Sequence, residues 1–187
     1  MDSLCNIRTS AKEGVRVKCS RSGLVATLLL SLASTTPFAA NETRDAPAAA
    51  ASPIYGVTIP HGYRKWQFVA PAEEADPLDE LRIVLGNPTV MKALEKNTLP
   101  FPDGSILVKL AWKRVPSTEF GPASVPGAAT TVQVMVKDSK RYRDSGGWGF
   151  GRFIDGQPAD LAQHQTCFAC HQARVKNHDF VFTRLAP

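Results

Sequence analysis

The sequence predicts a mainly β domain of the α+β class, in which an antiparallel sheet is accompanied by a few short helices. Three observations support this prediction. Short apolar or alternating segments recur between residues 81 and 154, short turns rich in glycine and proline separate them, and only one of these segments has the composition of a helix. An all-helical bundle or globule is therefore not expected.

The first predicted elements are a strand, a helix and a turn. Residues 81–87 (LRIVLGN) predict a strand that ends at Gly-Asn. Residues 88–97 begin with proline and continue with good helix formers, which predicts a short helix. The Pro-Asp-Gly sequence within residues 100–105 predicts a turn.

Three further segments complete the predicted sheet and its connections. Residues 106–115 (ILVKLAWKRV) are dense in apolar residues with high β propensity, and a Gly/Pro-rich loop is expected over residues 120–129. Residues 130–138 alternate between polar and apolar side chains, and residues 146–154 (GGWGFGRFI) predict an aromatic strand that begins with glycines. The sequence contains no internal repeats.

The first 40 residues have the composition of a signal peptide. Five basic side chains precede an uncharged apolar segment at 24–33, which is too short to span a bilayer as a helix, and small residues near Ala40 offer a cleavage site. Residues 41–53 are rich in alanine and proline and predict a flexible linker, so the folded domain is expected over residues 54–187. We expect export to the periplasm and no stable membrane insertion after cleavage.

Removal of the signal peptide changes the charge and the cysteine content of the protein. Residues 1–40 hold five basic and two acidic side chains, so only +2 of the formal net charge of +5 belongs to residues 41–187. The high pI therefore gives no support for nucleic-acid binding. Cys5 and Cys19 leave with the signal peptide, and the remaining 147 residues hold two cysteines and suffice for one domain.

The two remaining cysteines belong to a C-x-x-C-H motif, which is typical of covalent haem c attachment. On a helical turn, Cys167 and Cys170 present both sulfurs on one side, where they can add to the two vinyl groups of one haem. His171 can then reach the iron as the proximal ligand. A zinc site that combines both cysteines with two of His164, His171 and His178 is an alternative. A redox dithiol is a third interpretation, although the thioredoxin-like context that it needs is missing.

The sequence offers no obvious second axial ligand for the iron. No methionine follows His171, and Met91 and Met135 lie in apolar patterns typical of a core. The other histidines are expected to be solvated at the surface: His61, His164 and His178. A five-coordinate iron with one open face is therefore expected, and such a face binds small ligands or performs chemistry.

Lys109 lies within an apolar segment, with apolar neighbours on both faces of the expected strand. If this side chain is buried, desolvation lowers the pKa of the amine and makes the neutral, nucleophilic form more accessible. If the strand lies at the edge of the sheet, Lys109 faces water. The residues alone leave both alternatives open.

Five motifs follow one another along the chain: YRKW (63–66), FPDGSILVK (101–109), VKDSKRY (136–142), GGWGF (146–150) and the haem motif followed by DFVFTR (179–184). Together and in this order they resemble the cytochrome P-460 family. The resemblance covers nearly the whole mature domain. It implies a mainly β fold with one haem c near the C-terminus, a periplasmic location and oxidation of hydroxylamine, with nitric oxide as co-substrate or product in some members. It also implies a covalent bond from Lys109 to a haem meso carbon and a position near the haem pocket for Arg82.

One departure from the family concerns proton transfer. The resemblance implies a carboxylate just before the haem motif as a proton relay, and residues 161–166 (LAQHQT) contain none. Asp160 is the nearest carboxylate, and Gln163 or His164 are possible substitutes. Because hydroxylamine oxidation removes protons as well as electrons, a relay without a base is expected to be slow.

The related cytochrome c-prime-beta proteins share the fold, lack the lysine bond and bind nitric oxide or carbon monoxide in an apolar pocket. Five aromatic residues are candidates for lining such a pocket or for packing in the core: Phe101, Trp112, Trp148, Phe150 and Phe153. Three functions therefore stay open, namely oxidation of hydroxylamine or reaction with nitric oxide, binding of a gas for sensing or scavenging, and plain electron transfer. The expected partners are a small substrate or gas ligand, a periplasmic electron-transfer protein and, from the family, a second copy of the chain in a homodimer.

Overall fold

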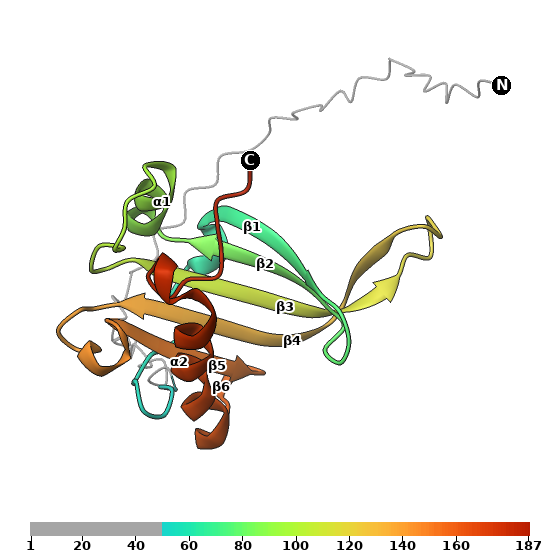
Figure 1. Cartoon of the computed structure of the whole chain (residues 1–187). Coiled ribbons are helices and arrows are strands. Elements are labelled where there is room, and N and C mark those ends of the chain that lie inside the picture. Colours follow the sequence, from blue (N-terminus) through green and yellow to red (C-terminus); the bar gives the residue numbers. More distant parts are fainter. Residues whose placement is uncertain (1–49) are drawn as a thin grey trace, which may run out of the picture. The chain divides into compact units, whose positions relative to one another are not determined.

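The computed structural model describes residues 50–187, and the predicted signal peptide and most of the predicted linker lie outside them. Six strands form one antiparallel sheet in the order β1-β2-β3-β4-β5-β6, so each strand pairs with its neighbours in the chain (Figure 1). They are β1 (Gln67–Glu74), β2 (Glu80–Gly86), β3 (Ile106–Pro116), β4 (Ser124–Lys137), β5 (Trp148–Ile154) and β6 (Gln157–Pro158). The prediction of a mainly β, α+β domain with an antiparallel sheet is confirmed.

Two α-helices interrupt and follow the sheet. Helix α1 (Pro88–Glu95) connects β2 to β3, and helix α2 (Leu161–Val175) follows β6 (Figure 1). Three single turns of 3₁₀-helix complete the described elements: η1 (Tyr63–Lys65), η2 (Arg143–Ser145) and η3 (Lys176–His178). No helix within residues 50–187 is long and apolar enough to cross a membrane.

The predicted elements β2, α1, β3 and β5 are present, as is the strand predicted at 130–138 within β4, but one predicted loop was wrong and one strand was not predicted. The loop expected over 120–129 is strand from Ser124 onward, because β4 continues the hairpin with β3 and pairs Val125 with Val115. The prediction also omitted β1, which contains Pro71. This strand lies at the edge of the sheet, where a residue without a backbone N–H is tolerated.

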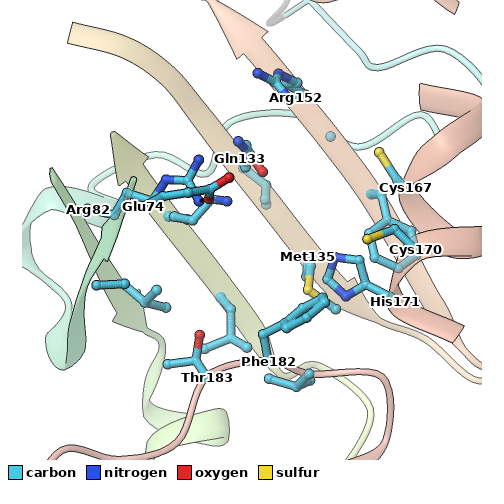
Figure 2. Close-up of a pocket in the computed structure, with 18 of the residues that line it drawn as sticks. Glu74, Arg82, Gln133, Met135, Arg152, Cys167, Cys170, His171, Phe182 and Thr183 are labelled. Carbon is cyan, nitrogen blue, oxygen red and sulfur yellow. Dashed lines mark ion pairs between the residues drawn. The ribbon is translucent and has the colours of Figure 1, made fainter. Parts of the chain in front are cut away.

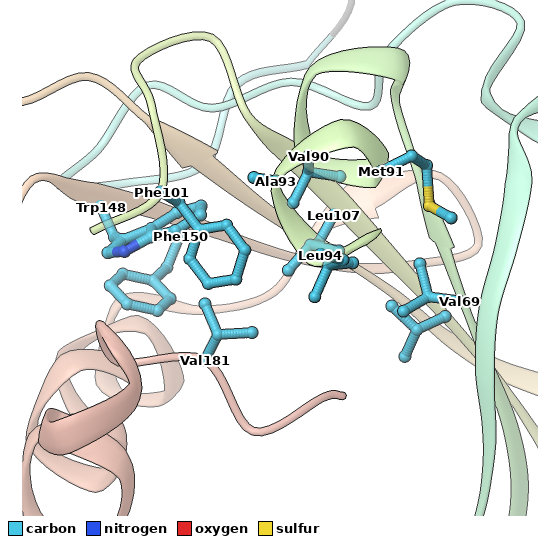
Figure 3. Close-up of a cluster of buried hydrophobic side chains, with 11 residues drawn as sticks. Val69, Val90, Met91, Ala93, Leu94, Phe101, Leu107, Trp148, Phe150 and Val181 are labelled. Atoms are coloured by element: carbon cyan, nitrogen blue, oxygen red, sulfur yellow. The ribbon is translucent and has the colours of Figure 1, made fainter. Parts of the chain in front are cut away.

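Both faces of the sheet are covered. One face packs against α1, α2 and the C-terminal segment in a core that includes Val90, Leu107 and Val181 (Figure 3). The other face packs against residues 55–66 in a second core. Helix α1 lies close to the sheet at Gly86, where a Cβ atom would approach Val90 Cγ1 to 2.7 Å. We refer to the first face, which also bears the site described below, as the near face.

The packed domain includes Ser52. Its hydroxyl donates a hydrogen bond of 2.9 Å to the carbonyl of Phe150 on β5 and accepts one of 3.0 Å from the N–H of Val57. Ser52 is fully buried, so packing against the sheet begins two residues before Ile54, where the domain was expected to start.

Candidate functional site

A cavity of about 610 Å³ lies between the near face of the sheet and α2 (Figure 2). This volume falls within the usual range of ligand sites, about 300–1,000 Å³. We call its two sides the sheet wall, made by the cavity-lining residues of β1 to β5, and the attachment wall, made by those of α2 and residues 181–183. Cys167, Cys170 and His171 all belong to the attachment wall.

Helix α2 is fixed to the sheet at its first turns. Asp160 caps the helix, because its carboxylate accepts a hydrogen bond of 2.8 Å from the N–H of Gln163, a contact typically worth about 1 kcal/mol. His164 is the one fully buried residue of α2. Its Nε2 accepts a hydrogen bond of 3.0 Å from the N–H of Arg152 on β5, and its Nδ1 lies 2.9 Å from the Asp160 carbonyl, to which it donates in this tautomer. The imidazole therefore ties the helix to the sheet.

The ring of His171 is held in a defined orientation. Its Nδ1 lies 2.7 Å from the carbonyl oxygen of Phe180, so Nδ1–H is the donor and Nε2 keeps its lone pair. The rings of Phe150 and Phe182 each lie 4.9 Å from the imidazole. Burial lowers the pKa of His171, which favours the neutral form that binds metals.

The two cysteines lie one helical turn apart on α2 and are both free thiols. Cys167 is half-buried and Cys170 is exposed. Burial raises the pKa of the Cys167 thiol, while Arg152 on the sheet wall acts in the opposite direction. The predicted pair of sulfurs on one side of a helix is therefore present beside His171.

The described residues do not assemble the zinc site that the sequence left open. No group of three or more His, Cys, Asp or Glu side chains among residues 50–187 could hold a metal ion. Both nitrogens of His164 are engaged, so its expected place at the solvated surface was wrong. His178 packs edge-on against Phe101, with Nδ1 2.9 Å from the carbonyl of Val181.

Lys109 lies on the sheet wall and not at a sheet edge. Strand β3 is flanked by β2 and β4, which place Val84 and Gln133 directly beside Lys109. The amine lines the cavity opposite α2. Burial, with a further contribution from Arg82, lowers its pKa to about 8. The edge-strand alternative is therefore excluded, and a substantial fraction of the amine is neutral near pH 8.

Arg82 also lies on the sheet wall, beside Glu74 (Figure 2). It forms ion pairs with Glu74, at the end of β1, and with Glu80, where two of its nitrogens lie 2.9 and 2.6 Å from Oε2. Glu80 is buried and accepts a further hydrogen bond of 2.7 Å from Thr130. Glu74 is the more exposed partner, with 43% of its side chain accessible. The ion pairs thus connect the partly exposed Glu74, through Arg82, to the buried Glu80.

Several predicted site residues lie elsewhere. Asp160 is a helix cap outside the cavity lining, whereas Gln163 does line it. Of the five aromatic candidates, Phe150 alone lines the cavity. Phe101, Trp148 and Phe153 are buried in the two cores. Met91 is a core residue as expected, but Met135 reaches the cavity.

The sequence interpretation missed Glu74, Arg152 and Phe182, all of which line the cavity. The only available signal was strand alternation, because Arg152 follows Phe150 by two residues and shares its face. Glu74 lies on the strand that was not predicted. Phe182 belongs to the DFVFTR motif, but nothing in that motif indicated a contact with His171.

The Cytochrome P460 family model matches residues 60–183. The chain belongs to the cytochrome P460 family. Membership supports a c-type haem cytochrome and therefore a haem as the occupant of this cavity. A search among curated proteins finds no match.

The residues of the cavity fit a haem. The attachment wall provides two free thiols one turn apart and an imidazole whose Nε2 is unengaged. Apolar side chains of Val84, Leu107 and Phe150 are available for contact with a macrocycle. These groups match what haem c requires, namely two thiols that can form thioethers with the vinyl groups, an imidazole for the iron and an apolar environment.

Proposed function

We propose that this protein is a periplasmic mono-haem c-type cytochrome with an open iron face, which oxidises hydroxylamine or reacts with nitric oxide. The observation that carries the proposal is the orientation of His171, whose Nδ1–H is bound by the Phe180 carbonyl and whose Nε2 is free in a cavity that also holds Cys167 and Cys170. Family membership supports the haem, and the resemblance noted in the sequence supports the reaction.

The chain's own residues have separate tasks in this proposal. Cys167 and Cys170 would hold the haem through its two vinyl groups, and His171 would bind the iron through Nε2. When bound, the haem supplies an iron that accepts electrons and binds a small nitrogen compound. Val84, Leu107 and Phe150 would form the apolar part of the cavity wall around it.

Lys109 is the candidate for a covalent bond to a haem meso carbon. Its amine lines the cavity, and burial lowers its pKa to about 8, so the nucleophilic form is accessible near neutral pH. Forming the bond would remove one hydrogen from the amine and one from the meso carbon, and a peroxide would serve as the two-electron oxidant, taking up the two electrons and two protons as it is reduced to water or an alcohol.

Glu74 is the candidate proton acceptor for hydroxylamine oxidation. The carboxylates that line the cavity within residues 50–187 are Glu73 and Glu74, both on β1. Glu74 is paired with Arg82 and partly exposed, so it can pass a proton from the cavity to solvent. His164 cannot serve, because the bonds described above occupy both its nitrogens.

Export, partners and assembly belong to the same proposal. The basic and apolar N-terminal segment supports periplasmic export without a retained membrane anchor. The electrons removed from hydroxylamine pass to a periplasmic electron-transfer protein. The family resemblance supports a homodimer, and the small charge of residues 41–187 gives no reason to expect a nucleic-acid partner.

Electron transfer is a second candidate function, because Met135 reaches the cavity. If the thioether of Met135 bound the iron, it would close the iron to small ligands. A gas-binding role without the lysine bond is the third candidate. Carbon monoxide binding to the reduced protein separates the electron carrier from the other two, and the lysine bond separates the remaining pair.

The test is to express the whole chain in a periplasm that matures haem c. The intact mass, the dithionite-reduced spectrum and a peptide map are then recorded. We expect one covalent haem, a red-shifted Soret band, a haem peptide that contains Lys109, and reduction of an added acceptor by hydroxylamine. The variant K109M is the control and should give an ordinary c-type spectrum. A purified protein with zinc or without haem would contradict the proposal.

A further inference from the structure

One backbone carbonyl provides the hydrogen bond that orients the imidazole of His171. Nδ1 of His171 lies 2.7 Å from the oxygen of Phe180, nine residues further along the chain. A hydrogen bond to the second ring nitrogen of a metal-binding histidine fixes the ring and raises the basicity of the ligating nitrogen. Whatever positions the Phe180 carbonyl therefore influences the iron ligand.

The backbone that carries this carbonyl has an unfavourable conformation. Asp179 and Phe180 both have positive φ, 47° and 63°, in the left-handed region that non-glycine residues rarely adopt. Two consecutive residues of this kind persist only where the surrounding structure holds them.

A buried ion pair holds this segment. The Asp179 carboxylate lies 2.8 and 2.9 Å from Lys137 Nζ, and it also accepts a hydrogen bond of 2.8 Å from the N–H of Phe101. The two charged side chains are only 6% and 9% exposed. Lys137 further donates to the carbonyl of Gly146 at 3.1 Å and lies 5.1 Å from the Trp148 ring centroid. Asp179 is thus fixed to β4, to the loop before β3 and, through Lys137, to the turn before β5.

The Phe180 ring packs against this same turn. A Cβ atom at Gly146 would lie 2.3 Å from Phe180 Cε2, so only glycine leaves room for the ring. Two contacts therefore position the carbonyl of Phe180: the Lys137–Asp179 ion pair at the preceding residue, and the packing of the Phe180 ring against Gly146.

We propose that the Lys137–Asp179 ion pair is a positioning device for the proximal ligand, which sets the strength of the His171–Phe180 hydrogen bond and, through it, the reduction potential of the haem iron. A buried ion pair is weak grounds for a purely stabilising role, because its desolvation offsets much of its attraction. The inference rests on the proposed haem attachment, but it does not depend on any activity toward hydroxylamine.

The test compares D179N with D79N in the haem-loaded protein. Asn tolerates positive φ, so D179N removes the charge without an added backbone penalty. Asp79 provides the matched control, since it also has positive φ (49°) and pairs with Arg114 at 2.7 Å, but at the turn between β1 and β2. We expect D179N to lower the Fe–His stretching frequency of the reduced protein in resonance Raman spectra and to raise its reduction potential. D79N should change neither quantity.

A second variant covers the case in which D179N fails to fold because Lys137 is left buried and unpaired. K137M/D179N removes both charges and should show the same lowered frequency and raised potential. Wild-type values in a folded D179N or K137M/D179N protein would overturn the inference while leaving the proposed function intact. A wild-type chain that takes up no covalent haem would overturn both.

Discussion

The two walls of the cavity are built on different principles. The attachment wall is held by bonds between imidazoles and backbone groups, as at His164 and His171, and by helix capping. The sheet wall instead carries most of the charges, among them Lys109, Arg152 and the pair of Arg82 with Glu74, whereas the attachment wall contributes Arg174. The difference suggests a division of labour in which one wall fixes the cofactor and the other controls charge and protons at the substrate.

The largest expected effect comes from removing the two thiols of the attachment wall. C167S/C170S should abolish covalent haem attachment, because no thiol remains in the cavity to add to the vinyl groups. Haem staining after denaturing electrophoresis and intact mass measure the loss. T166S, beside Cys167 on the same wall, should retain the haem. Covalent haem in C167S/C170S would show that the motif is not the attachment site.

On the sheet wall, the charge that should matter most for turnover is Glu74. E74Q should lower the turnover of hydroxylamine by about 10²-fold or more, the usual contribution of a positioned general base. E73Q is the matched control, because Glu73 is adjacent on β1 but pairs with Arg114 at 3.3 Å. Turnover is measured with the haem-loaded proteins at saturating substrate. Equal rates for E74Q and wild type would remove Glu74 from the proton path.

Substituting Lys109 tests how much the burial of its charge destabilises the domain. Its pKa falls from 10.5 to about 8 on folding, so the unfolded chain binds more protons between these values and stability should rise with pH across this window. Below pH 8 the charged amine should destabilise the haem-free domain by up to roughly 3 kcal/mol. K109M should recover this free energy at pH 7 and flatten the pH dependence. Denaturant unfolding of the haem-free chain at pH 7 and pH 10 measures both effects, and a pH dependence that K109M leaves unchanged would contradict the assignment.

The smallest effect concerns the hydrogen bond between Arg152 and His164, which ties α2 to the sheet. H164L should destabilise the domain by about 1–3 kcal/mol, because the N–H of Arg152 loses its partner in a buried position. H61L replaces an exposed histidine and should have almost no effect. Thermal unfolding of both variants gives the comparison. Similar unfolding midpoints for H164L and H61L would mean that other contacts hold α2 against the sheet.

The sequence predicted the attachment wall better than the sheet wall for a physical reason. The spacing of Cys167, Cys170 and His171 is local, so a single helical turn suffices to bring them together. Lys109 was identified by its apolar neighbours and by the family resemblance, but its burial depends on pairing with Val84 of β2 and Gln133 of β4, which are distant from it in the sequence. Only the order of strands in the sheet decides that question.

The parts of the site that could not be predicted depend on backbone conformation and on tertiary packing. The Phe180 carbonyl has no sequence signature, because its direction comes from two positive φ angles and from Lys137, far earlier in the chain. Asp160 is close to the haem motif in sequence, yet its carboxylate is used as a helix cap. The carboxylate that does line the cavity with Arg82, Glu74, comes from the edge strand β1.

Because α2 and residues 181–183 follow all six strands in chain order, the attachment wall is synthesised after the sheet wall. Every strand pairs with a neighbour in sequence, which keeps the loops that must close during folding short. Chains emerge from the ribosome or an export channel N-terminus first. The strands of the sheet wall can therefore pair before the two thiols of α2 are available, so under the proposed haem attachment the sheet can form before the tether does.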